Sequence, residues 1–173
     1  VRHLVITHEH TDHVKPGTLN GIVKGFPKID IYSTYKVARL HENVVAINTD
    51  YLPIYLGDTE MYAVPVVHNT LCFAYIFRFP NGEDVLYATD LQRTDELEVF
   101  LQQHPMKFDQ IFLESNYDDF KIELVRGEKH GRYNPYVDST TRHLSKDESL
   151  KFYVKHKKEG GEHIELHKST RFY

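Results

Sequence analysis

Cysteine and long apolar runs are both scarce in this chain. Cys72 is the only cysteine among 173 residues, so no disulfide can form within the chain, and a domain of this length buries a substantial core without one. The lack of disulfides favours a reducing compartment, and we expect a soluble, cytoplasmic protein. No apolar stretch approaches membrane-spanning length and no signal sequence opens the chain, so we expect no membrane partner.

Internal repeats and low-complexity segments are absent as well, and we expect one domain covering residues 1–173. Strand-like runs interspersed with amphipathic helical patterns predict a mixed α/β (α+β) fold. The expected strands are Arg2–Thr7, Lys28–Tyr32, Met61–Val67, Leu71–Phe79, Asp84–Thr89, Phe108–Leu113 and His163–Leu166. The expected helices are Pro16–Lys24, Thr34–Glu42, Asp95–Gln103 and Ser145–Lys157. A hairpin turn is predicted at Asn81-Gly82, because this pair accepts positive φ readily.

The densest chemical feature directly follows the first expected strand and reads His8-Glu9-His10-Thr11-Asp12-His13. Imidazole nitrogens and carboxylate oxygens suit a divalent zinc, manganese or iron ion, and a loop after a rigid strand holds them in place. His8 and His10 alternate toward one side and can share a first metal, whereas Asp12 and His13 can reach a second. A polar surface loop that happens to contain histidines is the alternative interpretation.

This motif resembles the signature of the metallo-β-lactamase-fold hydrolases, and the resemblance covers nearly the whole chain. That family has a third histidine after a later strand, a metal-bridging aspartate after a hairpin strand and a last histidine after a C-terminal strand. The matching positions are His68, Asp90 and His167. The resemblance implies an αββα sandwich with two divalent metal ions, zinc or manganese. It assigns His8, His10 and His68 to one ion and Asp12, His13 and His167 to the other, with Asp90 between them.

His143 competes with His167 for the place of the last ligand. Arg142-His143-Leu144-Ser145 is similar to a Gly-His-Leu-Ser element of the family's phosphodiesterase branch, although Arg142 replaces the usual glycine. In that branch a later His-x-Ser supplies the ligand, which favours His167, although Lys168 replaces the usual apolar residue. His143 would then precede a helix that Ser145 opens in capping-box style, and could protonate a leaving group.

Glu114-Ser115-Asn116-Tyr117-Asp118 is similar to a Glu-x-Asn-x-Asp run in small bacterial nucleases of the family. The resemblance implies that Glu114 orients His143 through a hydrogen bond. It also suggests substrate contacts from Asn116, Asp118, Arg142 and Ser145. A strand-to-helix turn with an Asx cap accounts for Asn116 and Asp118 equally well.

Charge is uneven along the chain. Residues 1–120 hold nine Lys and Arg against seventeen Asp and Glu, a net of −8, and residues 121–173 hold twelve against eight, a net of +4. Together they give the −4 of the whole chain. A possible phosphate-backbone contact surface lies before His143 and comprises Lys121, Arg126, Lys129, Arg132, Tyr133, Tyr136 and Arg142. A solvated surface loop has the same composition.

The resemblance implies a metal-dependent hydrolase in which a hydroxide bridging two metals attacks phosphorus or a carbonyl carbon. Asp12 and Asp90 would hold the hydroxide, and His143 would return a proton to the leaving oxygen. Asp90 and the His143 element favour the phosphodiesterase branch. The related tRNA 3′-processing endonucleases carry a long arm between the positions of His68 and Asp90, where this chain has only a compact hairpin. We therefore expect a DNA- or RNA-directed phosphodiesterase, or nuclease, of the small bacterial or phage exonuclease type.

Two other functions fit the same residues. An ester, lactone or thioester hydrolase would use the same metals on neutral acyl substrates, and a metal-binding module would bind them without turnover. The family places a first group of β-strands before the position of Val1. We therefore expect the sequence to be the catalytic part of a longer protein, without the N-terminal strands of the sandwich.

Overall fold

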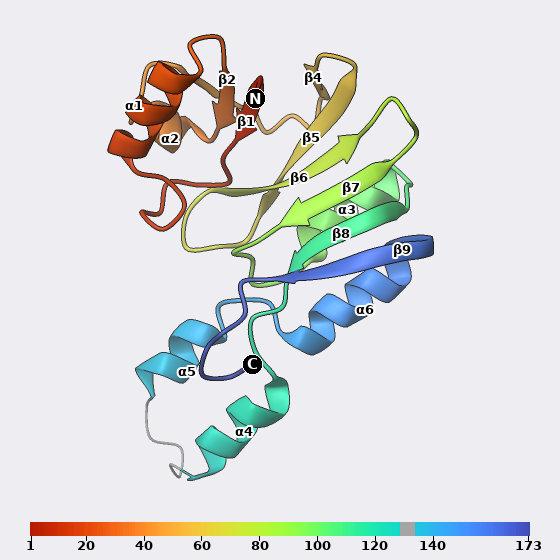
Figure 1. Ribbon diagram of the computed structural model, residues 1–173. Helices are drawn as coiled ribbons and strands as arrows, with labels where there is room; N and C mark the ends of the chain where they lie inside the picture. The colour runs from red at the N-terminus through yellow and green to blue at the C-terminus, as the bar shows by residue number, and fades with distance from the viewer. Residues whose placement is uncertain (129–133) are drawn as a thin grey trace.

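A computed structural model describes residues 1–128 and 134–173, which form two sheets with helices outside them (Figure 1). The smaller sheet has three parallel strands, β1 (His3–Val5), β2 (Asp30–Ser33) and β3 (Val44–Ala46). The larger sheet contains, in order, β4 (Ile54–Leu56), β5 (Thr59–Val66), β6 (Cys72–Arg78), β7 (Asp84–Ala88), β8 (Phe108–Glu114) and β9 (Lys157–Leu166). Strands β4 to β7 are antiparallel, whereas β7, β8 and β9 are parallel.

Helices provide the crossovers that parallel strands require. α1 (Pro16–Gly25) and α2 (Tyr35–Ala38) link the strands of the smaller sheet, and α3 (Asp95–Gln103) and α6 (Lys146–His156) lie along the larger one. α4 (Asp119–Glu128) and α5 (Pro135–Thr140) extend away from both sheets (Figure 1). Across the described residues, no helix combines the length and the apolar character needed to cross a membrane.

The alternation of side chains along β5 and β6 separates the layers. Met61 and Ala63 join Phe73 and Tyr75 in a buried cluster between the two sheets. The residues of these strands that point the other way pack against α3 and α6; they are Tyr62, Val64, Cys72, Ala74 and Ile76. A separate cluster holds α1 and α2 on the outer face of the smaller sheet. The resulting order of helix, sheet, sheet and helix confirms the predicted αββα sandwich.

The smaller sheet covers only part of the larger one. A cavity of about 690 Å³ lies between β1 and α1 on one side and strands β6 to β8 on the other. Phe77, Tyr87 and Phe112 line it, and Tyr87 is 37% exposed. His13 also lines this cavity, which therefore adjoins the cluster of polar side chains described below.

Several predicted element boundaries were wrong. The helix expected over residues 34–42 ends at Ala38, because Leu40 N–H bonds to Val37 O and tightens the last turn. The last strand begins at Lys157 rather than His163. Gly160 there has a φ of 74°, and a side chain at Gly161 would put Cβ 2.7 Å from a backbone oxygen, so two glycines permit the irregular register.

Four elements were not predicted at all. β3 and β4 have three residues each, which is too few to produce an alternating pattern. α4 and α5 lie in the segment before His143, where a surface loop was expected. They are held by a small cluster of Ile122, Val137 and Phe172, so the packing partner comes from the distant C-terminus.

Candidate metal centre

Side chains that can bind a metal gather where several strands end. His8, His10 and His13 follow β1, His68 follows β5, and Asp90 follows β7. Glu114 ends β8, His143 precedes α6 and His167 follows β9. Within the described residues, these side chains form three overlapping groups of possible ligands: His8, His10 and His68; His8, His13 and Asp90; and Asp90, Glu114, His143 and His167.

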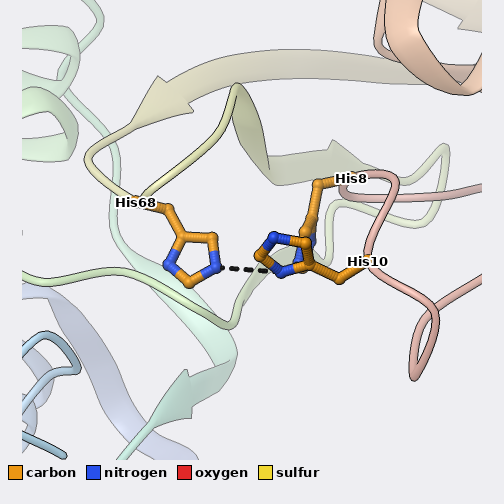
Figure 2. Close-up of side chains that lie close together, drawn as sticks. All are labelled: His8, His10 and His68. Carbon is orange, nitrogen blue, oxygen red and sulfur yellow. Dashed lines mark hydrogen bonds between the residues drawn. The ribbon is translucent and has the colours of Figure 1, made fainter. Parts of the chain in front are cut away.

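The first group consists of imidazoles only. His8 Nε2 lies 2.9 Å from His10 Nδ1, and His10 Nδ1 lies 3.3 Å from His68 Nε2 (Figure 2). His10 Nδ1 thus lies close to two other ring nitrogens, although one shared proton can form a hydrogen bond in only one of these two contacts. A cation accepts all three lone pairs at once, so this donor set fits a divalent metal.

Burial lowers the pKa of two of these imidazoles, which leaves them uncharged and able to bind a cation. His8 is fully buried, and burial, together with the neighbouring His13, lowers the pKa of His8 to about 4. Burial also lowers the pKa of His68. Both rings are therefore neutral at physiological pH and present lone pairs. The remaining nitrogen of His8, Nδ1, lies 3.0 Å from Thr7 Oγ1 and 3.6 Å from the Cys72 thiol, which fix the ring's orientation.

The second part of the centre is rich in carboxylate. Glu114 is fully buried, and its Oε1 lies 2.7 Å from both His143 Nδ1 and His167 Nδ1. Its Oε2 accepts the Leu91 N–H at 2.8 Å. Asp90 Oδ2 lies 3.0 Å from His13 Nε2, and Asp90 Oδ1 lies 3.6 Å from His167 Nδ1. Two buried carboxylates thus face three histidines.

In this second part the pKa values of the carboxyl groups are lowered and those of two histidines are raised. Burial opposes ionisation of Asp90, but the hydrogen bond from His13 and the nearby histidines hold the pKa of Asp90 well below its usual range. Burial likewise opposes ionisation of Glu114, whose pKa is lowered by hydrogen bonds from His143 and His167. The hydrogen bond to Asp90 raises the pKa of His13, and the bond to Glu114 raises that of His167. Anions and protonated imidazoles therefore stabilise one another.

Two of the expected ligands have unusual backbone conformations. Asp90 has a φ of 55° and His167 a φ of 52°, in the left-handed region that residues other than glycine rarely occupy. Each is the turning point just after a strand, β7 or β9. Asn116 Nδ2 donates to His167 O at 2.7 Å and holds that turn. Such strain persists where surrounding contacts enforce it, typically at functional positions.

The remaining expected site residues lie around this cluster. Asp12 lies outside the three ligand groups and its side chain is 71% exposed. Asp118 Oδ1 accepts the Phe120 N–H at 2.9 Å and caps α4, as in the Asx-cap interpretation. Ser145 is buried and caps α6, and Arg142 is exposed, 3.7 Å from Asp138. Asn116 Nδ2 and Ser145 Oγ are thus engaged by the backbone.

Basic and aromatic side chains gather around the C-terminal segment that follows His167. Of the expected contact surface, Lys129, Arg132 and Tyr133 fall outside the described residues, while the exposed members are Lys121, Arg126, Tyr136 and Arg142. Sequence reasoning missed the contribution of the C-terminus. Lys168 Nζ lies 4.4 Å and Lys146 Nζ 5.2 Å from the centre of the Tyr173 ring, and Arg171 lies 3.9 Å from that of Tyr136.

Comparison with protein-family models found no match, and comparison with curated protein sequences found none either. Solved structures do match. The metallo-β-lactamase fold protein YhfI from Bacillus subtilis is 17% identical, with a TM-score of 0.71 over 98% of this chain and 65% of that one. A diphosphatase of the PhnP family is 18% identical, with a TM-score of 0.63 over 99% and 61%. The short form of human tRNase Z is 15% identical, with a TM-score of 0.58 over 98% and 73%.

These similarities show that the chain has the metallo-β-lactamase fold, as the opening motif predicted. The chain spans less than two thirds of the length of YhfI and of the diphosphatase. One fold hosts many reactions, so the chemistry of this chain has to be argued from its own side chains.

Proposed function

We propose that this chain, which has the metallo-β-lactamase fold, is a metal-dependent hydrolase that cleaves phosphodiester bonds in DNA or RNA. The contact between Glu114 and His143 carries this proposal. Glu114 Oε1 lies 2.7 Å from His143 Nδ1, and the side chain of His143 is 19% exposed. The bond keeps a proton on Nδ1, so the other ring nitrogen, Nε2, is free to exchange a proton with a substrate.

A positioned proton donor discriminates between leaving groups. The alkoxide released from a nucleic-acid phosphodiester is a strong base and leaves much faster when it is protonated, whereas the thiolate of a thioester leaves readily without help. A buried carboxylate that orients an imidazole is therefore of most use with an alkoxide leaving group. His143 would donate this proton, and Glu114 would stabilise the imidazolium before the transfer.

The centre has the donors for two divalent ions, zinc or manganese. His8, His10 and His68 would hold one, and His13 and His167 would hold the other, with Asp90 between the two ions. Such ions, when bound, lower the pKa of water and neutralise charge on phosphoryl oxygens. Asp90 is ionised throughout the neutral range and lies between the two groups, while the exposed Asp12 lies at the rim.

An anionic polymer also fits the surface beside the centre. Residues 121–173 carry a net charge of +4 in a chain of −4, and Lys146 and Lys168, the residue after His167, flank the ring of Tyr173. Cationic groups near an accessible aromatic ring can contact phosphates and a stacked base together, and the ring of Tyr173 is partly exposed. Two structural neighbours are named as a diphosphatase and a tRNase, which is consistent with chemistry at phosphorus.

The test is turnover of bis(p-nitrophenyl) phosphate and of labelled DNA and RNA oligonucleotides by protein reconstituted with zinc or manganese. We expect cleavage of the small diester and of at least one oligonucleotide, abolished by a chelator. p-Nitrophenyl acetate, a lactone and a thioester serve as competing substrates. Turnover of these alone would contradict the proposal in favour of acyl hydrolysis. Bound metal without any turnover would identify a metal-binding module instead.

A further inference from the structure

Glu9 lies between two expected ligands, His8 and His10, yet it belongs to none of the ligand groups. Its carboxylate is turned instead toward Thr70 and Lys36. Its Oε1 accepts a hydrogen bond from Thr70 Oγ1 at 2.5 Å and lies 3.1 Å from Lys36 Nζ. Its Oε2 is buried without a hydrogen-bond partner among the described residues, so these two side-chain contacts fix the carboxylate.

The three side chains close a ring of contacts. Lys36 Nζ donates to Thr70 Oγ1 at 2.6 Å, so the Thr70 hydroxyl accepts from the lysine while it donates to Glu9. At each of the three contacts a donor faces an acceptor. Each member comes from a different segment: Glu9 from the loop after β1, Thr70 from the loop between β5 and β6, and Lys36 from α2.

Two of these segments are the ones that carry the imidazole group. Thr70 lies two positions after His68, and Glu9 adjoins both His8 and His10. His10 and His68 meet at 3.3 Å across the same gap between the loops (Figure 2). The contact between Glu9 and Thr70 therefore joins the two loops that carry the ligand nitrogens, and Lys36 ties them to the smaller sheet.

We propose that Glu9, Thr70 and Lys36 form a positioning clamp that sets the spacing of His68 from His8 and His10, and thereby the affinity of this site for its metal. This inference rests on the metal-binding part of the proposed function and not on the substrate. The side chains of Lys36 and Glu9 are 37% and 23% exposed, and partly exposed ion pairs contribute little to folding. The clamp acts on the ligands, because each contact holds a loop that carries one.

The test measures stepwise binding of Zn²⁺ and Co²⁺ to chelator-treated protein, with competition against a chelating dye. Thr70→Val removes the hydroxyl and Glu9→Gln removes the charge, while His68→Ala identifies the binding step that belongs to the imidazole site. We expect Thr70→Val and Glu9→Gln to weaken that step by roughly 10- to 100-fold, the range seen when partners of metal ligands are removed. The other step should stay within about twofold of the original protein, because the second group of ligands has its own supports.

Two variants separate positioning from general stability. Thr70→Ser keeps the hydroxyl, so its metal affinity should return to that of the original protein. Lys155→Met is the control. It breaks the contact of Lys155 on α6 with Glu98 on α3, which is 2.6 Å long like that between Lys36 and Thr70. This contact lies far from the imidazoles, so both binding steps should stay unchanged. The proposal is overturned if Thr70→Val binds metal like the original protein, or if both steps weaken alike. Failure of phosphodiester turnover would leave this readout intact and would count against the proposed substrate only.

Discussion

The two parts of the metal centre are built from different chemistry. His8, His10 and His68 form an all-imidazole group in which burial lowers the pKa of His8 and His68. Asp90 and Glu114, by contrast, are buried carboxylates that raise the pKa of His13 and His167 through hydrogen bonds. The imidazoles of His8 and His68 are therefore uncharged at neutral pH, whereas those of His13 and His167 hold an added proton more readily than a free histidine does.

This difference predicts that metal affinity depends on pH differently in the two parts. A ligand group that is already deprotonated binds its metal without releasing protons, so its affinity changes little around neutral pH. A group stabilised by protons must release them when the metal enters, so its affinity rises with pH. The proton donor of the proposed reaction, His143, lies in the second part, where the proton chemistry is concentrated.

Removal of His143 should have the largest effect. We expect His143→Ala to lower turnover of bis(p-nitrophenyl) phosphate by roughly 10²- to 10⁴-fold, the usual contribution of a general acid, with metal content unchanged. His41→Ala, at a partly exposed histidine bonded to Asn20, is the matched control and should leave turnover unchanged. A loss of one metal per chain in His143→Ala would instead place His143 among the ligands.

The stability of the metal-free protein should depend on the imidazole part. Because the pKa of His8 is about 4 in the folded protein and 6.5 in the unfolded chain, the unfolded state takes up a proton first as pH falls. The free energy of unfolding should therefore decrease with acidification, by roughly 2 kcal/mol from this residue between pH 7 and pH 5. Urea unfolding at both pH values measures it.

The control for this titration is His8→Gln, which should lose most of that dependence. The raised pKa values of His13 and His167 act in the opposite sense, since their contribution is present at low pH and is lost as pH rises. The lowered pKa values of Asp90 and Glu114 add a loss of stability only in more acidic solution. An equal pH dependence in the original protein and in His8→Gln would refute this assignment.

Glu114 tests the carboxylate part directly. Glu114→Gln preserves shape but removes the negative charge that His143 and His167 both contact at Oε1. We expect kcat to fall by roughly 10- to 100-fold with little change in KM. Glu98→Gln, which changes another carboxylate bonded to a histidine at 2.9 Å, should have no effect on kcat. Equal losses in the two variants would indicate a general effect on folding.

The smallest expected effect concerns the basic surface beside the carboxylate part. Replacing Lys146 and Lys168 by alanine should raise KM for an oligonucleotide and reduce the salt dependence of binding by roughly one unit of slope per lysine. Turnover of bis(p-nitrophenyl) phosphate should stay the same. Lys151→Ala with Lys155→Ala, at two other exposed lysines of α6, provides the control. If both pairs change the slope equally, the surface has no specific role.

Much of the fold and of the imidazole part was predictable because both depend on local pattern. The motif from His8 to His13 follows an apolar strand, and the order of His68, Asp90 and His167 along the chain matches the family. The structure brings these residues together, and it places Glu114 beside His143 as expected.

Contacts between distant segments could not be predicted in the same way. Nothing in the local sequence links Lys36 to Thr70, or Lys146 to Tyr173, because these pairs meet only when separate loops and helices pack. Glu9 was visible inside the motif, but its role depends on the direction of one side chain. The early start of β9 depends on Gly160 and Gly161, which permit the irregular register between β8 and β9.

The most direct test of this account is the metal content of purified protein after reconstitution and removal of free metal, determined by elemental analysis for the original chain, His68→Ala and Asp90→Ala. We predict about two ions per chain in the original protein, with His68→Ala keeping the ion of the carboxylate part and Asp90→Ala keeping that of the imidazole part. An original protein that binds no metal, or a His68→Ala variant that keeps the full content, would contradict a centre built from two distinct parts.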